Sequence, residues 1–250
     1  MAAMTAESIQ WGETPIQANR WHEIDDLWIA VDERPHETDV SYCHARPGKH
    51  GWRCFSALRE VRVPVSTEFI VEQRLSPRPV VARPYKPVIV PAQRSVTLYV
   101  GTPLWLTLLQ EGEVLIDVPV TRMSDTWFGV DTMAGEVCFD CQTRARTSMD
   151  GVRTNPFKAI TPVVVHNDMT SPITIDRINL PVPHMSLFRG PERHWTSPLI
   201  LHSRERWSEE TNVRIEADPP PESPEAELVA SPRVPLESGL LRKTMHLLLG

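Results

Sequence analysis

Residues 120–155 read VTRMSDTWFGVDTMAGEVCFDCQTRARTSMDGVRTN, and they decide the fold class because they form the longest run of this chain without a proline. Even this run contains Gly129, Gly135 and Gly151, and its apolar residues do not recur at the three- and four-residue spacing of a helix. Because a glycine costs a helix about 1 kcal/mol relative to alanine, the run predicts strands and loops.

Outside this run, 24 prolines are scattered along the whole chain. A proline inside a helix costs about 3 kcal/mol, and it biases the preceding residue toward extended geometry. The apolar segments between the prolines are short and rich in Val, Ile and Leu. They predict strands at residues 27–31, 59–65, 69–71, 88–90, 96–100, 104–109, 114–118, 137–143, 162–166, 173–180, 198–202 and 212–216. We therefore predict an all-β protein of antiparallel sheets, either one large β-sandwich or two in tandem.

Proline richness is also typical of disordered chains. That interpretation fits only residues 217–235, where prolines alternate with acidic residues and an extended linker is expected. The linker leads to residues 238–249, which have helical spacing behind a capping Ser238 and predict a short C-terminal helix. This segment either docks on the protein's own core or is offered to a protein partner or a membrane surface.

The pattern predicts three parts: N-terminal strands over residues 1–93, a main β-sandwich over 94–217, and the acidic linker with its terminal segment over 218–250. Residues 78–87 are too proline-dense to be expected inside a sheet, and they indicate a linker or a crossover. Residues 162–166 and 173–180 predict a hairpin, with a β-bulge near Arg177 where the alternation of apolar residues changes phase.

The net charge of the 28.4 kDa chain is -6, which provides no overall basic field and argues against nucleic acid as a partner, although local arginine clusters remain open. No apolar run approaches the roughly 20 residues of a membrane span, and the first residues lack the pattern of an export signal. We expect a cytoplasmic protein without a transmembrane segment, and peripheral membrane contact is left open.

The four cysteines form two pairs in the sequence. Cys43 and Cys54 flank a turn-forming stretch, and a two- or four-residue loop would place them directly opposite each other in a hairpin. Cys138 and Cys141 have the spacing of half a zinc site, so all four thiolates together are one alternative. The other is that they are small buried apolar residues, because residues three apart on a strand point to opposite faces.

Catalytic motifs are absent: the sequence has no phosphate-binding glycine loop and no Gly-x-Ser-x-Gly turn, and we predict no cofactor. The most distinctive segment is residues 123–132, where Ser124 and Asp125 suit a turn and the adjacent Trp127 and Phe128 are expected in a loop. Two large aromatic residues in a loop either plug the open end of a sandwich or present a binding surface.

The phrases around this segment, YVGTPLW at 99–105 and GEVC at 135–138, together with LPVP at 180–183, resemble an uncharacterised prokaryotic family, domain of unknown function family 432. The resemblance spans about residues 80–187. It implies no reaction and no catalytic residues.

Two function classes follow. The first is a non-enzymatic module that binds another protein through Trp105, Trp127 and Phe128 or through the terminal segment. The second is a ligand-binding or hydrolytic sandwich whose site is assembled from distant residues, with His166, Asp168, Arg144 and Asp125 as candidates. Whether the protein is an enzyme is left open. The binding residues predicted from sequence are Trp105, Asp125, Trp127, Phe128 and Arg144.

Overall fold

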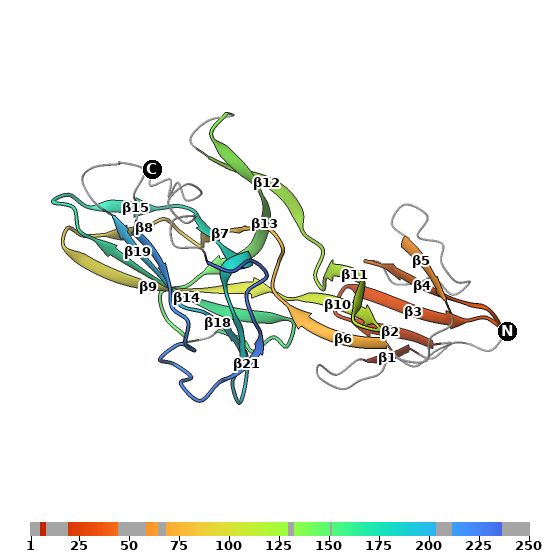
Figure 1. Ribbon diagram of the computed structural model, residues 1–250. Helices are drawn as coiled ribbons and strands as arrows, with labels where there is room; N and C mark the ends of the chain where they lie inside the picture. Colours follow the sequence, from red (N-terminus) through yellow and green to blue (C-terminus); the bar gives the residue numbers. More distant parts are fainter. Residues whose placement is uncertain are drawn as a thin grey trace. The chain divides into compact units, whose positions relative to one another are not determined.

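Figure 1 shows a computed structural model of the chain, in which strands provide nearly all of the regular structure. The structure describes residues 6–8, 20–44, 59–64, 69–129, 133–150, 152–203 and 212–236. Within these residues the only helical element is one 3-10 turn, η1 (Val182–His184). The predicted all-β class is confirmed. The predicted C-terminal helix lies outside the described residues, and so does the Cys54 side of the predicted Cys43–Cys54 hairpin.

The chain divides into two compact units, and each is built from two separate segments. Unit 1 comprises Met1–Arg74 and Leu104–Arg122, and unit 2 comprises Leu75–Pro103 and Met123–Gly250. The sequence-based division into residues 1–93, 94–217 and 218–250 stays a prediction.

Unit 1 holds a five-stranded sheet and a three-stranded sheet. The first sheet has its strands in chain order: β1 (Ala6–Ser8), β2 (Arg20–Ile24), β3 (Leu27–Glu33), β4 (Glu37–Cys43) and β5 (Arg59–Pro64). In the second, β10 (Trp105–Gln110) lies between β6 (Phe69–Arg74) and β11 (Glu113–Pro119). Glu111 and Gly112 both have positive φ, as a two-residue hairpin turn requires.

Unit 2 contains three sheets. The four-stranded sheet has the order β12 (Ser124–Gly129), β13 (Gly135–Ala145), β7 (Val80–Pro84) and β16 (Ile178–Leu180). The seven-stranded sheet consists of β9 (Arg94–Pro103), β14 (Lys158–Asn167), β17 (Leu187–Arg189), β18 (His194–Thr196), β19 (Leu199–Ser203), β20 (Asn212–Ile215) and β21 (Glu227–Ala230). The pair β8 (Val88–Val90) and β15 (Ile173–Ile175) forms the third.

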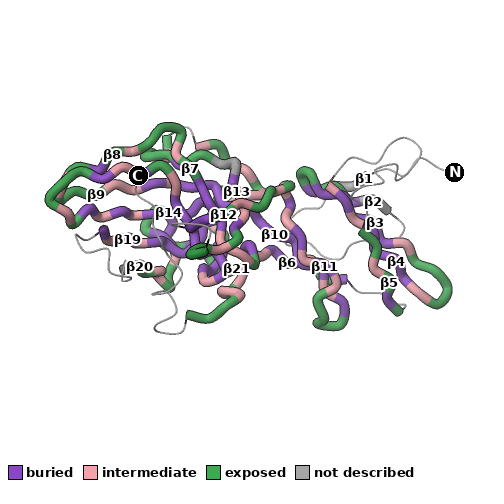
Figure 2. Tube along the Cα trace, turned by 90° about the horizontal axis from the view of Figure 1, so that it is seen from above, coloured by how far each residue is buried: buried purple, intermediate pink, exposed green. Residues whose placement is uncertain are grey.

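Strand β14 is the centre of unit 2, and it is buried along most of its length (Figure 2). One edge pairs antiparallel with β9 over ten residues. The other edge pairs in parallel first with β18, at Ala159 and Ile160, and then with β19, from Val163 onward. Pro162 falls in the gap between these two partners, where its missing N–H costs no ladder hydrogen bond.

The expectation that residues 78–87 are too proline-dense for a sheet is wrong. Strand β7 lies inside the four-stranded sheet, parallel to β13 and antiparallel to β16. The prolines occur only at its margins, because Pro84 is its last residue and Pro79 precedes it. The Pro79 carbonyl even extends the ladder by accepting a hydrogen bond from the Phe139 N–H at 2.9 Å.

The predicted hairpin of residues 162–166 and 173–180 is also wrong. Strand β15 pairs with β8, and β16 pairs with β7, so Arg177 lies between two strands of different sheets and not in a bulge. The Asn167 amide redirects the chain, since its Nδ2 donates to the carbonyls of Val90, Pro91 and Ser171 at 2.9, 3.0 and 2.9 Å. A buried side-chain amide thus replaces the expected hairpin turn.

The acidic, proline-rich segment expected to be a linker is hydrogen-bonded to unit 2 in its described part. Strand β21 pairs with β17. Beyond it, the Val234 N–H donates to the Pro183 carbonyl at 3.0 Å, and the Arg233 guanidinium donates to the Leu75 carbonyl at 2.6 Å. The prolines here order an extended chain on a surface, which lowers the entropy cost of docking it.

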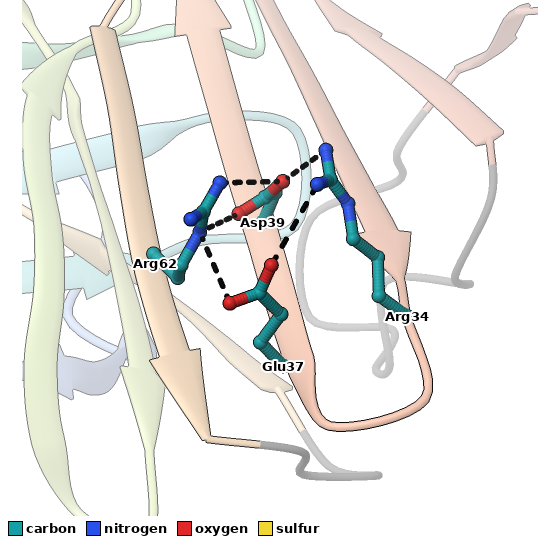
Figure 3. Close-up of polar contacts among 4 residues, drawn as sticks. All are labelled: Arg34, Glu37, Asp39 and Arg62. Carbon is teal, nitrogen blue, oxygen red and sulfur yellow. Dashed lines mark hydrogen bonds and ion pairs between the residues drawn. The ribbon is translucent and has the colours of Figure 1, made fainter.

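A cross-strand charge network ties together strands β3, β4 and β5 of unit 1 (Figure 3). Asp39 accepts from Arg62 Nε at 2.7 Å and pairs with Arg34 at 2.5 Å, while Glu37 pairs with Arg62 at 3.4 Å. The hydrogen bond from Arg62, together with both guanidinium charges, lowers the pKa of Asp39, whereas burial raises the pKa of the neighbouring Asp32.

We expect the substitution Asp39→Asn to destabilise the protein more at pH 6 than at pH 3. A carboxyl group with a lowered folded-state pKa contributes stability above its unfolded pKa of about 3.9, and this contribution is lost as the pH falls. Thermal unfolding of both proteins at the two pH values measures the effect. A difference in unfolding midpoint that does not change with pH would contradict the role given to Asp39.

Candidate functional site

A pocket of about 200 Å³ in unit 2 lies where β9, β14 and the end of β13 meet the loop of residues 147–157. Its apolar surface comes from Tyr99, Val152 and Ile160. These residues belong to a hydrophobic cluster that also contains Phe188 and Trp195, so the floor of the pocket is part of the core. A site built on packed strands is held more rigidly than one built on loops alone.

The rim of this pocket is strongly cationic. It is formed by Arg144, Arg146, Arg153, Lys158 and Arg193. The lining includes no Asp, Glu, His or Cys among the residues that the structure describes. Hence we call it the Arg144 pocket, after the one rim residue that the sequence analysis had already selected.

A β-bulge positions Arg144. Strand β13 pairs with β7 from Phe139 to Cys141, and the pairing resumes at Arg144 only after a register shift of the backbone. An extra residue in one strand bends it and re-aims the side chains that follow. The guanidinium of Arg144 lies over the Tyr85 ring, 4.4 Å from its centroid, which is a cation–π distance.

The backbone of Arg146 is fixed to β9 by two hydrogen bonds. Tyr99 N–H donates to the Arg146 carbonyl at 2.7 Å, and Arg146 N–H donates to the Tyr99 carbonyl at 3.0 Å. The loop that follows is shaped by side-chain turns, in which Ser148 Oγ accepts from the Asp150 N–H and Asn155 Oδ1 accepts from the Phe157 N–H. Arg153 is therefore carried by a loop anchored at both ends.

Tyr99 also forms a hydrogen bond with a carboxylate. Its hydroxyl donates to Glu222 Oε1 at 2.6 Å, and burial followed by this hydrogen bond raises the pKa of Tyr99 to about 12. The phenol stays protonated near neutral pH and keeps this hydrogen bond to Glu222. Among the rim cations, Arg193 pairs with Glu192 at 3.5 Å. Within the described residues, no carboxylate lies within ion-pair distance of Arg144, Arg146 or Arg153.

Two open hollows of about 510 and 480 Å³ adjoin the pocket, and both share Arg144 with it. They add Arg83 and Lys86 to the cations, and they add Asp140 and Asp150 as carboxylates. We call the three together the basic groove. Seven cationic side chains line it against two carboxylates, in a chain whose net charge is -6.

The other predicted binding residues do not line this groove. Trp105 is 1% exposed on β10 in the core of unit 1, and Phe128 is 2% exposed in a cluster with Val81 and Cys138. Asp125 pairs with Arg78 at 2.7 Å on β12. Its partner on β13 is Phe139, five residues before Arg144, which separates the two by roughly 16 Å along the strand.

Trp127 is 43% exposed, on a strand rather than in the expected loop. It faces Val137, which is 46% exposed, on the β12–β13 hairpin, and this hairpin extends from the rest of unit 2 in Figure 1. Side chains alternate between faces, so Trp127 points outward and Phe128 inward. Gly129 and Gly135 face each other in the ladder, and a Cβ on Gly135 would lie 2.8 Å from the Trp127 ring.

His166 and Asp168 come together with a third residue that the sequence analysis did not select. His202 stacks on His166 with ring centroids 4.6 Å apart, and its Nδ1 lies 2.9 Å from Asp168 Oδ2. His166 is eight residues from Lys158 on β14, or roughly 26 Å at about 3.3 Å per residue. The predicted combination of these residues with Arg144 and Asp125 is therefore not assembled.

Cys138 and Cys141 on β13 have different neighbours. The Cys138 thiol lies near Asn179, and the Cys141 thiol donates to the Gly101 carbonyl at 3.2 Å. Cys43 is buried on β4, and Cys54 lies outside the described residues. In the part of the chain that the structure describes, no group of three or more His, Cys, Asp or Glu residues is close enough to hold a metal ion.

A local cluster of basic residues in the sequence could have indicated most of the pocket cations. Arg144, Arg146, Arg153 and Lys158 place four cations within fifteen residues, in a chain with more acidic than basic residues. No pattern in the sequence indicates Arg193 or Tyr99, because they reach the pocket only through the pairing of distant strands.

We expect Phe128→Ala to cost about 3–5 kcal/mol of unfolding free energy, because it empties a buried aromatic site. The neighbouring Trp127→Ala is the matched control, since it removes a half-exposed ring from the same strand, and we expect less than half that loss. Denaturant unfolding measures both, and equal losses would contradict the inward and outward assignment.

We also expect Cys138 to resist alkylation by iodoacetamide at pH 8 in the folded protein. Burial and the charge of Glu136 raise the pKa of its thiol to about 12, and the thiolate is the reactive form. Mass spectrometry before and after denaturation gives the readout, with the unfolded chain as the control. Labelling of folded Cys138 as fast as in the unfolded chain would contradict this assignment.

Comparison with known proteins gives a family and no closer relative. Searches of characterised proteins and of solved structures found no significant match. No helix in the described part of the chain is long and apolar enough to cross a membrane. A family model described as "Protein of unknown function (DUF432)" matches residues 10–249. The chain therefore belongs to the DUF432 family, as the phrases around residues 99–105 and 135–138 indicate.

Proposed function

We propose that this protein is a ligand-binding β-sandwich that holds a phosphorylated organic molecule in the Arg144 pocket. The observation that carries the proposal is the combination of five cationic side chains with an apolar floor in one cavity. Ligand sites are typically concave and largely apolar, with a few polar groups that define what is recognised.

The charge of the pocket favours an anionic ligand. Clustered cations repel one another, and an anion that binds among them relieves this repulsion. Arginine side chains bind phosphate and carboxylate groups through paired, charge-assisted hydrogen bonds. The rim supplies four arginines, of which Arg193 pairs with Glu192 at 3.5 Å, while the Glu222 carboxylate accepts a hydrogen bond from Tyr99.

The floor favours a ligand that also has an apolar or planar portion. Tyr99, Val152 and Ile160 offer a surface that a bare inorganic anion would leave uncovered. The described lining has no carboxylate, imidazole or thiol that would act as a general base, so its chemistry is that of binding. This proposal belongs to the second function class predicted from the sequence, and Arg144 is the predicted site residue that also lines the pocket.

Isothermal titration calorimetry with adenosine, AMP, ATP and inorganic tripolyphosphate tests the proposal. We expect affinity to rise from adenosine to AMP to ATP, and tripolyphosphate to bind more weakly than ATP because it lacks a ring. Binding of none of the four, or equal binding of adenosine and ATP, would refute the proposal.

The double variant Arg146→Gln/Arg153→Gln should weaken ATP binding at least about tenfold, since a hydrogen bond to a charged group is worth about 1.5–3 kcal/mol. The matched control is Arg214→Gln on β20, where Arg214 is 73% exposed and pairs with Glu216 at 3.0 Å. Unchanged affinity in the double variant would remove the pocket from the proposal.

A protein-interaction function has one supporting observation, which is the exposed pair of Trp127 and Val137 on an edge hairpin. Trp105 and Phe128 are buried, so they give this function no support from exposure. Contact through residues 238–249, with a protein or a membrane surface, stays a prediction, as does a cytoplasmic location. Comparing the partners captured by the full chain and by a chain ending at Pro235 tests the terminal segment, and identical partners would exclude it.

A further inference from the structure

We propose that the ligand of the basic groove is single-stranded nucleic acid, with one base in the Arg144 pocket and the adjoining backbone along the groove. This inference rests on the proposed function, because it needs the pocket to accept a phosphorylated ring. It goes further in naming a polymer, and the reasons are the size of the groove, the distribution of its charge and an exposed aromatic ring outside the pocket.

The groove offers more space than one small ligand needs. The two open hollows lie beyond the pocket and continue from Arg144 toward the loop between β7 and β8. Each is larger than the pocket itself, at about 510 and 480 Å³ against about 200 Å³. A mononucleotide held in the pocket would leave these hollows empty, whereas a chain that continues past Arg144 would fill them.

The positive charge is spread along the groove and not gathered at one point. Arg144 and Arg146 are two residues apart, which is roughly 6.6 Å along extended backbone. Lys86 lines the two open hollows, and Arg153 lines the pocket. Repeated cations along a groove match repeated phosphates, whereas a compact dianion would use only a few of them.

Tyr85 provides a second surface for a ring. Its side chain is 68% exposed, and Arg144 holds it at a cation–π distance of 4.4 Å. Large exposed aromatic rings in basic grooves are the surfaces on which successive bases stack in proteins that bind single strands. A membrane headgroup or a run of acidic residues would meet the cations but has no ring to place on Tyr85.

The pocket also favours a single strand over a duplex. Its apolar floor lies in a cavity of about 200 Å³, so a ring must enter it to reach Val152 and Ile160. Bases in a duplex are stacked and paired, and they are not free to enter a cavity without breaking that stack. The net charge of -6 does not oppose this, because a phosphate in the groove meets the local cations first.

Fluorescence anisotropy tests the inference. The probes are labelled thymidine oligonucleotides of twelve and two nucleotides, called dT12 and dT2, and the RNA counterpart of dT12, with heparin as a competitor. We expect dT12 to bind at least tenfold more tightly than dT2. The logarithm of its affinity should fall with the logarithm of salt concentration with a slope of about −3.5, because five net charges contribute about 0.7 each. A difference between the DNA and RNA arms would show whether the sugar is also recognised.

Variants separate the parts of the groove. Tyr85→Ala should weaken dT12 binding by between about fivefold and 150-fold, with a smaller effect on ATP, and Tyr85→Phe should restore binding because it keeps the ring. The double variant Arg146→Gln/Arg153→Gln should weaken the binding of both dT12 and ATP. It should also reduce the magnitude of the slope of log affinity against log salt concentration by about 1.4. Arg214→Gln, with its side chain on β20, should change neither.

Two outcomes would overturn the inference. If ATP binds and dT12 binds no more tightly than dT2, the groove takes a small ligand, and the proposed function stands without the polymer. If heparin, which has no bases, binds as tightly as dT12 and Tyr85→Ala has no effect, the groove is a general polyanion surface. Absence of binding by ATP and dT12 alike would refute the proposed function as well.

Discussion

The ladder between β9 and β14 is the interaction on which the structure of unit 2 depends. Ten consecutive residue pairs join these strands, and β14 uses its other edge for β18 and β19. A strand that pairs on both edges and is buried on its faces must satisfy all of its backbone polar groups within the sheet. Pro162 has no N–H to satisfy, and it lies where the partner of β14 changes.

The basic groove follows from that ladder. Tyr99 and Gly101 on β9 face one side of the site, while Lys158 and Ile160 come from the start of β14. The two hydrogen bonds between Tyr99 and Arg146 then attach the end of β13 to the same sheet. The floor is therefore core, and the cations lie at the margins of packed strands. Such an arrangement holds charged groups in place at little entropic cost, because the strands are already ordered for other reasons.

Much of the fold could be read from the sequence, and the failures share a cause. The segments 88–90, 96–100, 114–118 and 212–216 were predicted as strands because each is a short apolar run between turn residues, and each lies in a strand. Strand β7 was missed because its prolines were read as excluding a sheet, although they occur only at its margins. Strand β12 was missed because Ser124 and Asp125 suit a turn, yet they pair with β13. Local preferences of this size are overridden by pairing with a neighbouring strand.

What the sequence by itself determined is the class of the protein: proline spacing excludes long helices for steric and hydrogen-bonding reasons that act locally. The sequence also indicated Arg144 as a candidate binding residue. It indicated the family to which the chain belongs as well. Only the tertiary structure decided which cations lie close together, because residues far apart in the chain share a cavity only after folding: Arg83 lines one hollow with Arg144, and Arg193 lines the pocket with Arg144. Net charge is a sum over the whole chain, whereas a ligand responds to the charges within about a Debye length, and their positions are set by the fold.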